Sequence, residues 1–266
     1  MSYGAELWGW KEWRKLEKIQ LDYIWSTLGL DFCTSRYIIV RETGRIKMQR
    51  DWIRRAIKFE QKCAKAEEGR LIKIVWEQQA KEGLDEERRE ALDKLGLSYR
   101  YIELAIRNGI KIEEEVEGRM VDIIKQETEA AVDKARYNSD YAKRKSSEKP
   151  KYLRTYKKGV DIRIMARIRC GNLEERNRFW KKGEGKCVLC GEFDGSLMHL
   201  SNECKEVVGN KDGGNIKKWK TEEIVNPEGC REVVKLFKKI DAMIRNSRVK
   251  KEEEIVRNKE TDEKKA

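Results

Sequence analysis

The sequence predicts an all-α protein of extended helical segments with a small cysteine-containing knuckle near the C-terminus. Charged residues make up 41% of the 266 positions, and only two are proline. This composition is typical of exposed helices, because proline interrupts the helical hydrogen-bond ladder. Apolar side chains also recur at the 3.6-residue period of amphipathic helices. We find no clear strand pattern beyond a short hairpin at the cysteines.

Five windows in the first 136 residues follow the helical period. They cover residues 5–28, 52–63, 71–76, 85–95 and 112–136, with Gly29, Gly44 and Gly69 as helix stops or separators. The last window is a long amphipathic helix whose polar face carries charges of both signs, as suits solvent exposure. We assign Trp8, Trp13 and Trp25 to the core, because aromatic stripes at helical spacing are far more often core packing than base-stacking platforms.

The second half of the chain predicts shorter elements. Periodicity is lost over residues 137–159, which we expect to form a linker. A short basic helix follows and ends at Gly171, and Asn172 is expected to cap the next helix with Glu175 in a capping box. A later helix has Val233, Phe237, Ile240 and Ile244 in register. The predicted segments are an amphipathic helical region at 1–142, a basic linker with helices at 143–186, the knuckle at 187–204, and a C-terminal helix with a charged tail at 205–266.

The net charge of +12 is concentrated in one of these segments. Residues 1–142 are neutral, residues 143–186 carry +11, residues 187–204 carry −3, and residues 205–266 carry +4. A localised positive field of this kind attracts polyanions and speeds their encounter. A solvated, lysine-rich helix surface has a similar composition, but the concentration of charge favours a nucleic acid partner.

The sharpest motif consists of Cys187, Cys190, His199 and Cys204. The Cys-x2-Cys turn places two thiolates on one side of a tight knuckle, and Gly191 supplies the backbone freedom that this turn needs. The eight residues after Cys190 bring His199, the only histidine, to the same face. The four residues after His199 then bring Cys204 there as the third thiolate. These ligand types and spacings match a structural Zn²⁺ site, in which four protein ligands leave no position for water or substrate. We interpret the remaining cysteines as structural thiols: Cys33, Cys63, Cys170 and Cys230.

Motifs for independent catalysis are missing from the sequence. No two aspartates are adjacent, so the metal-binding pair of a polymerase palm is absent. With His199 assigned to the metal, no histidine remains for general-base or triad chemistry. A glycine-rich phosphate loop and a deaminase signature are also absent. We therefore expect no enzyme activity and no small-molecule substrate.

An ordered series of short motifs along residues 3–204 resembles the region after the reverse-transcriptase core in insect non-LTR (LINE-type) retrotransposon polyproteins. The series begins with Tyr3-Gly4-Ala5-Glu6, Trp8, Trp10-Lys11-Glu12, Leu16-Glu17 and Leu28-Gly29, continues with Pro150–Leu153, Ala166–Asn172 and Arg178-Phe179-Trp180, and ends in the Cys-Cys-His-Cys knuckle around Met198-His199-Leu200. Where the family usually has Thr-Pro after the first helix, this chain has Thr34-Ser35. The resemblance implies the C-terminal part of a reverse transcriptase without its polymerase motifs. It also implies a knuckle that binds element RNA or target DNA during target-primed reverse transcription.

Together these observations predict a non-catalytic, nucleic-acid-binding fragment with one structural Zn²⁺ and a basic arm. The predicted phosphate contacts are Arg163, Arg167, Arg169, Arg176, Arg178, Lys181, Lys182 and Lys186. The expected partners are RNA or DNA and a reverse-transcriptase core. No membrane partner is expected, because no stretch approaches the roughly 18 apolar residues of a span and the N-terminus lacks a signal-peptide core. We expect an intracellular ribonucleoprotein of the cytoplasm and nucleus.

Two other interpretations of the sequence stay open. The neutral helices of residues 1–142 suit an interaction scaffold that docks a polymerase core supplied in trans. The chain also fits a degenerate fragment with no activity.

Overall fold

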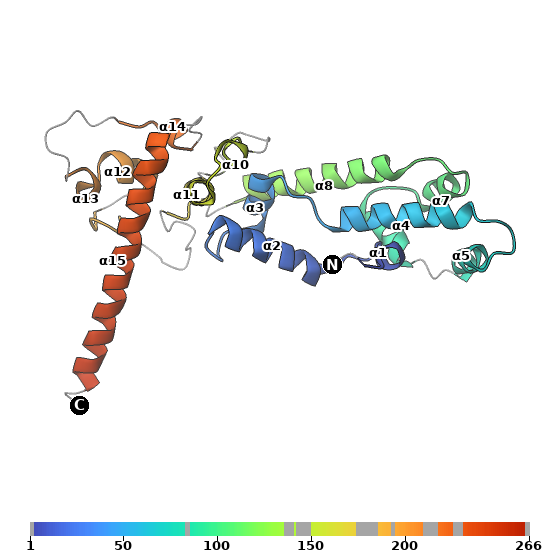
Figure 1. Ribbon diagram of the computed structural model, residues 1–266, viewed down its shortest axis with the longest axis horizontal. Coiled ribbons are helices and arrows are strands. Elements are labelled where there is room, and N and C mark those ends of the chain that lie inside the picture. The colour runs from blue at the N-terminus through green and yellow to red at the C-terminus, as the bar shows by residue number, and fades with distance from the viewer. Residues whose placement is uncertain are drawn as a thin grey trace. The chain divides into compact units, whose positions relative to one another are not determined.

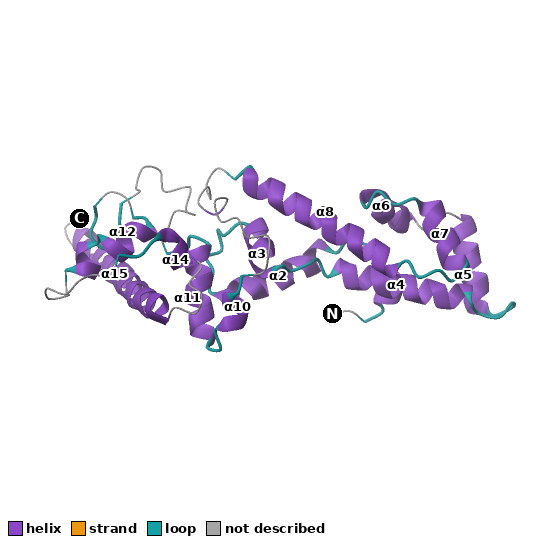
Figure 2. Cartoon of the chain, turned by 90° about the horizontal axis from the view of Figure 1, so that it is seen from above, coloured by secondary structure: helices purple, strands orange, loops and turns teal. Residues whose placement is uncertain are grey.

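A computed structural model describes residues 3–82, 86–135, 141, 150–173, 186–192, 195–209, 218–225 and 231–263 (Figures 1 and 2). All regular elements in these ranges are helices, which confirms the all-α prediction, and the expected hairpin is reduced there to a single bridge residue, Lys186. Among the described helices, none is both long and apolar enough to cross a membrane. The chain forms two compact units, unit 1 (Met1–Asp22 and Arg45–Ala131) and unit 2 (Tyr23–Gly44 and Val132–Ala266).

Unit 1 is a group of helices around one apolar core. Its elements are α1 (Ala5–Trp8), the first part of α2 (Arg14–Leu28), α4 (Gln49–Ala64), α5 (Leu71–Glu82), α6 (Glu86–Lys94), α7 (Tyr99–Arg107) and most of α8 (Glu113–Asp133). Ile57 of α4, Leu92 of α6 and Ile106 of α7 are fully buried together. Val116 and Met120 of α8 face the same core, as their spacing predicts.

Two surface features of unit 1 involve large apolar or aromatic side chains, and the first corrects an expectation from the sequence. Trp13 is 40% exposed, so its assignment to the core is wrong, although it meets Trp8 edge-on with ring centroids 6.0 Å apart. Its other neighbour is the Lys11 ammonium, 5.4 Å from the ring centroid, which leaves the indole at the surface. The start of α5 also exposes four large apolar side chains: Leu71, Ile72, Ile74 and Val75.

Unit 2 is built around the packing of two helices, α11 (Gly159–Arg169) and α15 (Arg231–Glu263). Its other elements are the last part of α2, α3 (Arg36–Thr43), α10 (Tyr152–Thr155), α12 (Leu197–Asn202), α13 (Lys205–Val208) and α14 (Thr221–Val225). Ile168 of α11 and Phe237 of α15 are fully buried in one core with residues of α12, α13 and α14. The predicted register of α15 is confirmed, since Val233, Phe237, Ile240 and Ile244 are all buried.

The two units divide the chain differently from the four predicted segments, because residues near position 34 pack against residues near position 170. The Asn172 side chain makes this connection. Its Oδ1 accepts hydrogen bonds from the Asp31 backbone N–H and, at 3.1 Å, from the Thr34 hydroxyl, and its Nδ2 donates to the Cys170 carbonyl at 3.0 Å. The predicted capping partner Glu175 lies outside the described residues. Asn172 therefore joins two distant loops of unit 2.

A buried ion pair between Glu42 of α3 and Arg169 of α11 lies beside this connection. The two side chains are 1% and 5% exposed. Arg169 also donates from Nη1 to the Val225 carbonyl at 2.8 Å, and the Tyr141 hydroxyl donates to Glu42 Oε2 at 2.9 Å. Glu42 raises the pKa of Arg169 against the opposing effect of burial, which is the larger single influence. Each buried charge is thus compensated by an opposite charge and by hydrogen bonds, as burial of charge requires.

Replacing Glu42 by glutamine is expected to destabilise unit 2. The variant leaves the Arg169 guanidinium buried without a counter-charge, so the free energy of unfolding should fall by about 3 kcal/mol in urea denaturation. Arg257→Gln is the matched control, because Arg257 pairs with Glu253 on an exposed part of α15, and its effect should stay below about 0.5 kcal/mol. A Glu42→Gln protein as stable as the control would contradict the structural role of the pair.

The same pair predicts a loss of stability in alkali. Burial, and then the charge of Glu42, raise the pKa values of Tyr141 and Tyr152 well above 10. The folded chain therefore keeps both phenols protonated where the unfolded chain ionises. Their contribution is complete below about pH 10 and decreases above it, by about 1.4 kcal/mol per pH unit for each tyrosine. Urea midpoints measured between about pH 8 and pH 11 should show this slope. Tyr141→Phe should flatten it, whereas Tyr23→Phe, which alters an exposed ring, should not.

Candidate metal centre

The first two cysteines of the knuckle lie on a tight backbone turn. The Cys187 N–H donates to the Glu192 carbonyl at 2.7 Å, and the Gly191 N–H donates to the Cys187 carbonyl at 2.9 Å. Gly191 has a φ of 75°, in the left-handed region that glycine adopts at low cost. The turn therefore places Cys187 and Cys190 on one side, as their spacing predicts.

Short helices bring the other two side chains to this turn. Ser196 caps α12, and its hydroxyl accepts a hydrogen bond from the His199 N–H at 3.2 Å. The Cys204 N–H donates to the His199 carbonyl at 2.7 Å, and the Cys204 carbonyl then accepts from the N–H groups of Val207 and Val208. Cys204 is thus held between the end of α12 and the start of α13.

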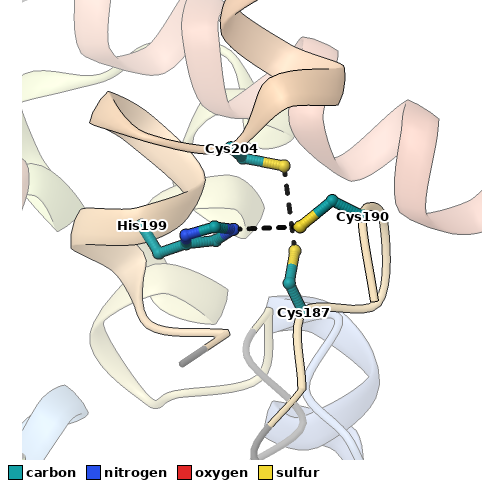
Figure 3. Close-up of side chains that lie close together, drawn as sticks. All are labelled: Cys187, Cys190, His199 and Cys204. Carbon is teal, nitrogen blue, oxygen red and sulfur yellow. Dashed lines mark hydrogen bonds between the residues drawn. The ribbon is translucent and has the colours of Figure 1, made fainter. Parts of the chain in front are cut away.

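The four side chains converge on one point (Figure 3). The Sγ atoms of Cys187 and Cys204 lie 3.8 Å apart, and Cys190 Sγ lies 3.2 Å from His199 Nε2. All four potential ligand atoms lie within 4.8 Å of one another, and three of the four residues are buried. Such a group can hold a metal ion, and it is the only group of this kind in the described part of the chain.

The surroundings orient these side chains. His199 turns Nε2 toward the sulfurs, while its Nδ1 lies 3.8 Å from the Glu203 carboxylate, a separation longer than a hydrogen bond. Glu192 of the turn pairs with Lys205 of α13 at 2.6 Å, and this pairing lowers the pKa of Glu192 and raises that of Lys205. Burial, followed by the neighbouring Cys187, raises the pKa of Cys204 to about 12. A bound cation would offset this cost of ionising the thiol.

The knuckle belongs to the core of unit 2. Cys187, Leu200, Cys204 and Val207 lie in the same apolar cluster as Phe237 of α15. A further contact joins α12 to the segment before α14, where Asn202 exchanges two hydrogen bonds of 2.9 Å with the backbone of Trp219. Because the predicted knuckle shares its core with these helices, a change at the cysteines acts on the packing of unit 2.

The predicted phosphate contacts fall into three groups. Arg176, Arg178, Lys181 and Lys182 lie outside the described residues. Arg163 and Lys186 are exposed, and Arg163 donates from Nε to the Thr27 carbonyl at 2.9 Å. Arg167 and Arg169 are instead used inside unit 2, where Arg167 pairs with the buried Asp241 and Arg169 with Glu42. We remove these two from the contact set, because their guanidinium groups are committed to internal carboxylates.

Sequence reasoning missed both of those carboxylates. Asp241 stands within the apolar register of α15, next to Ile240, and Glu42 follows the apolar run of α3. An acidic residue inside an apolar face is the signal that points to a buried ion pair, although it does not identify the partner.

The metal centre predicts tetrahedral cobalt binding. Co²⁺ added to the reduced chain should bind in a 1:1 ratio and give the d–d and thiolate charge-transfer absorption of a tetrahedral sulfur-rich site. Cys204→Ser should weaken binding by more than about tenfold, since altering even the outer partners of a ligand costs that much. Cys63→Ser is the matched control, because Cys63 is a buried thiol of unit 1 outside the cluster. Absence of these bands in the unsubstituted chain would reject the ligand set.

Comparison of the chain with protein families, with curated proteins and with solved structures finds no match.

Proposed function

We propose that the chain is a non-catalytic nucleic-acid-binding protein with one structural Zn²⁺, and that it corresponds to the C-terminal region of a non-LTR retrotransposon reverse transcriptase. The observation that carries the proposal is the convergence of three thiols and one imidazole beside the basic segment of the chain. The family assignment rests on the ordered sequence motifs.

Zinc is the metal that suits these ligands best. Three sulfurs and one nitrogen are the ligand set of structural zinc sites, and zinc–sulfur bonds of about 2.3 Å place tetrahedral ligand atoms about 3.8 Å apart. The separation of Cys187 Sγ and Cys204 Sγ equals this value. Four protein ligands complete the coordination, so the ion stabilises the fold and offers no position to a substrate. Since the site lies within the core of unit 2, part of its binding free energy is folding free energy.

The nucleic-acid interaction is supported by the distribution of charge. Residues 143–186 carry a net charge of +11, and Lys186 directly precedes the first zinc ligand. With Arg167 and Arg169 removed, the predicted contacts are Arg163, Arg176, Arg178, Lys181, Lys182 and Lys186. Lysine and arginine contacts to phosphates favour affinity over sequence choice. We therefore propose RNA or single-stranded DNA as the partner, bound through its backbone.

Binding of this kind should depend steeply on salt. Fluorescence anisotropy of the zinc-loaded full chain with labelled single-stranded RNA and DNA, at about 50 and 200 mM salt, should show an affinity loss of about 300-fold for six phosphate contacts. Sequence-scrambled oligonucleotides serve as the control and should bind equally well. Absent or salt-insensitive binding would contradict the proposal. It would favour the interaction scaffold, for which the exposed apolar residues of α5 offer a contact surface.

A further inference from the structure

The exposed face of α15 carries a row of cations. The net charge of residues 205–266, which is only +4, does not indicate this row. We define the α15 stripe as Arg231, Lys235 and Lys239, which are four residues apart and all exposed. An α-helix rises 1.5 Å per residue, so neighbouring members stand about 6 Å apart along the axis on one side of the helix. Between positions 231 and 250 the helix holds seven basic and two acidic residues.

The stripe opposes the stability of its own helix. Like charges four residues apart destabilise a helix, and the stripe contains two such pairs in succession. Arg231 is also the first residue of α15, where the helix dipole disfavours a cation. Among the described residues, none of the three makes an ion pair that would offset these costs. The stability of α15 therefore does not explain why Arg231, Lys235 and Lys239 are basic.

The carboxylates that α15 and α11 turn toward each other are paired with other cations. Asp241, the only acidic residue between Lys239 and Lys250, is 2% exposed and pairs with both Arg167 and Arg245. Asp161 of α11 pairs with Lys238, on the flank of the stripe. These pairs neutralise charges that face α11. The outer face of α15 then carries the three stripe cations and one exposed carboxylate, Glu232, so it stays positive.

The opposite face of α15 holds the helix in place. Phe237, Ile240 and Ile244 are fully buried in the core that also contains Cys204 and Leu200, so α11 and α12 pack against α15 behind the stripe. Figure 1 shows α11, α12 and α14 gathered along the first half of α15. The cations therefore stand on a supported helix, which lowers the entropy lost when a ligand binds them.

We propose that the α15 stripe is a second binding surface for the phosphodiester backbone of a nucleic acid, an inference that rests on the proposed function. Three exposed cations in a row complement a regularly spaced polyanion, and their short spacing lets one stretch of backbone contact all three. An anionic membrane is the less suitable occupant. Membrane-surface helices expose large apolar residues beside their cations, whereas the large apolar residues between positions 233 and 244 of α15 are buried or half-buried.

The test compares variants of the zinc-loaded full chain that carry the same change in net charge. The stripe variant replaces Arg231, Lys235 and Lys239 by glutamine. The matched control replaces three exposed lysines of α2 and α4 by glutamine: Lys15, Lys18 and Lys58. Anisotropy with labelled RNA should show about tenfold weaker binding for the stripe variant, and its slope of log affinity against log salt should fall by about 2–3. The control should change the affinity less than about twofold.

Further variants separate this inference from the proposed function. The charge-preserving set Arg231→Lys, Lys235→Arg and Lys239→Arg should bind as the unsubstituted chain does, and circular dichroism should show all variants equally helical. A third set replaces Arg176, Arg178, Lys181 and Lys182 by glutamine.

Each outcome of the test bears separately on the α15 inference and on the proposed function. If the third set weakens binding and the stripe variant does not, the α15 inference is overturned and the proposed function stands. If the unsubstituted chain binds no nucleic acid, both fail. If the stripe variant instead loses binding to phosphatidylserine vesicles while RNA binding is unchanged, the surface belongs to a membrane and the inference is overturned.

Discussion

The convergence of Cys187, Cys190, His199 and Cys204 is the constraint that holds the short helices α12 and α13 against the core of unit 2. α12 and α13 have six and four residues, and helices of that length are not stable alone in water. They keep their places because Leu200 and Val207 enter the apolar core while the neighbouring His199 and Cys204 meet the Cys187 turn. A cation held by the three thiols and the imidazole would couple its binding free energy to this packing. The candidate metal site and the core would then stabilise each other.

Features set by residues close in the chain could be predicted from the sequence. The metal-binding group spans eighteen positions, and the geometry of a Cys-x2-Cys turn and a capped helix is largely local. The apolar faces of α8 and α15 follow directly from a 3.6-residue period. Gly29 and Gly191 adopt the left-handed conformation that a helix end and a tight turn require. In each case the pattern that predicts the feature lies in residues close together in the sequence.

Features set by distant residues could not be predicted. Glu42 and Arg169 are 127 positions apart, and nothing in either local pattern identifies the other as its partner. The contact of the Asn172 amide with a loop near Thr34 was not predicted for the same reason. The capping interpretation of Asn172 stays a prediction, because residues 174–185 lie outside the described part of the chain. Charge counting treated every arginine as a surface group, whereas burial gives Arg167 and Arg169 internal partners. The predicted segments follow composition and charge along the chain, whereas residues 23–44 group with residues 132–266 in unit 2.

The difference between local and distant interactions also explains why the sequence alone does not predict the cationic stripe of α15. Its first twenty residues hold seven basic and two acidic side chains, and its last thirteen hold three basic and six acidic ones, so a sum over the segment largely cancels. The helical period places the side chains of these first twenty residues on different faces. Asp241 faces Arg167, whereas Lys235 and Lys239 are exposed. Because α12 packs on the inner face of this helix, the metal centre supports the element that presents the cations. Under the proposed function, removing a metal held by these four residues is therefore expected to weaken nucleic-acid binding, although the four residues are not among the proposed phosphate contacts.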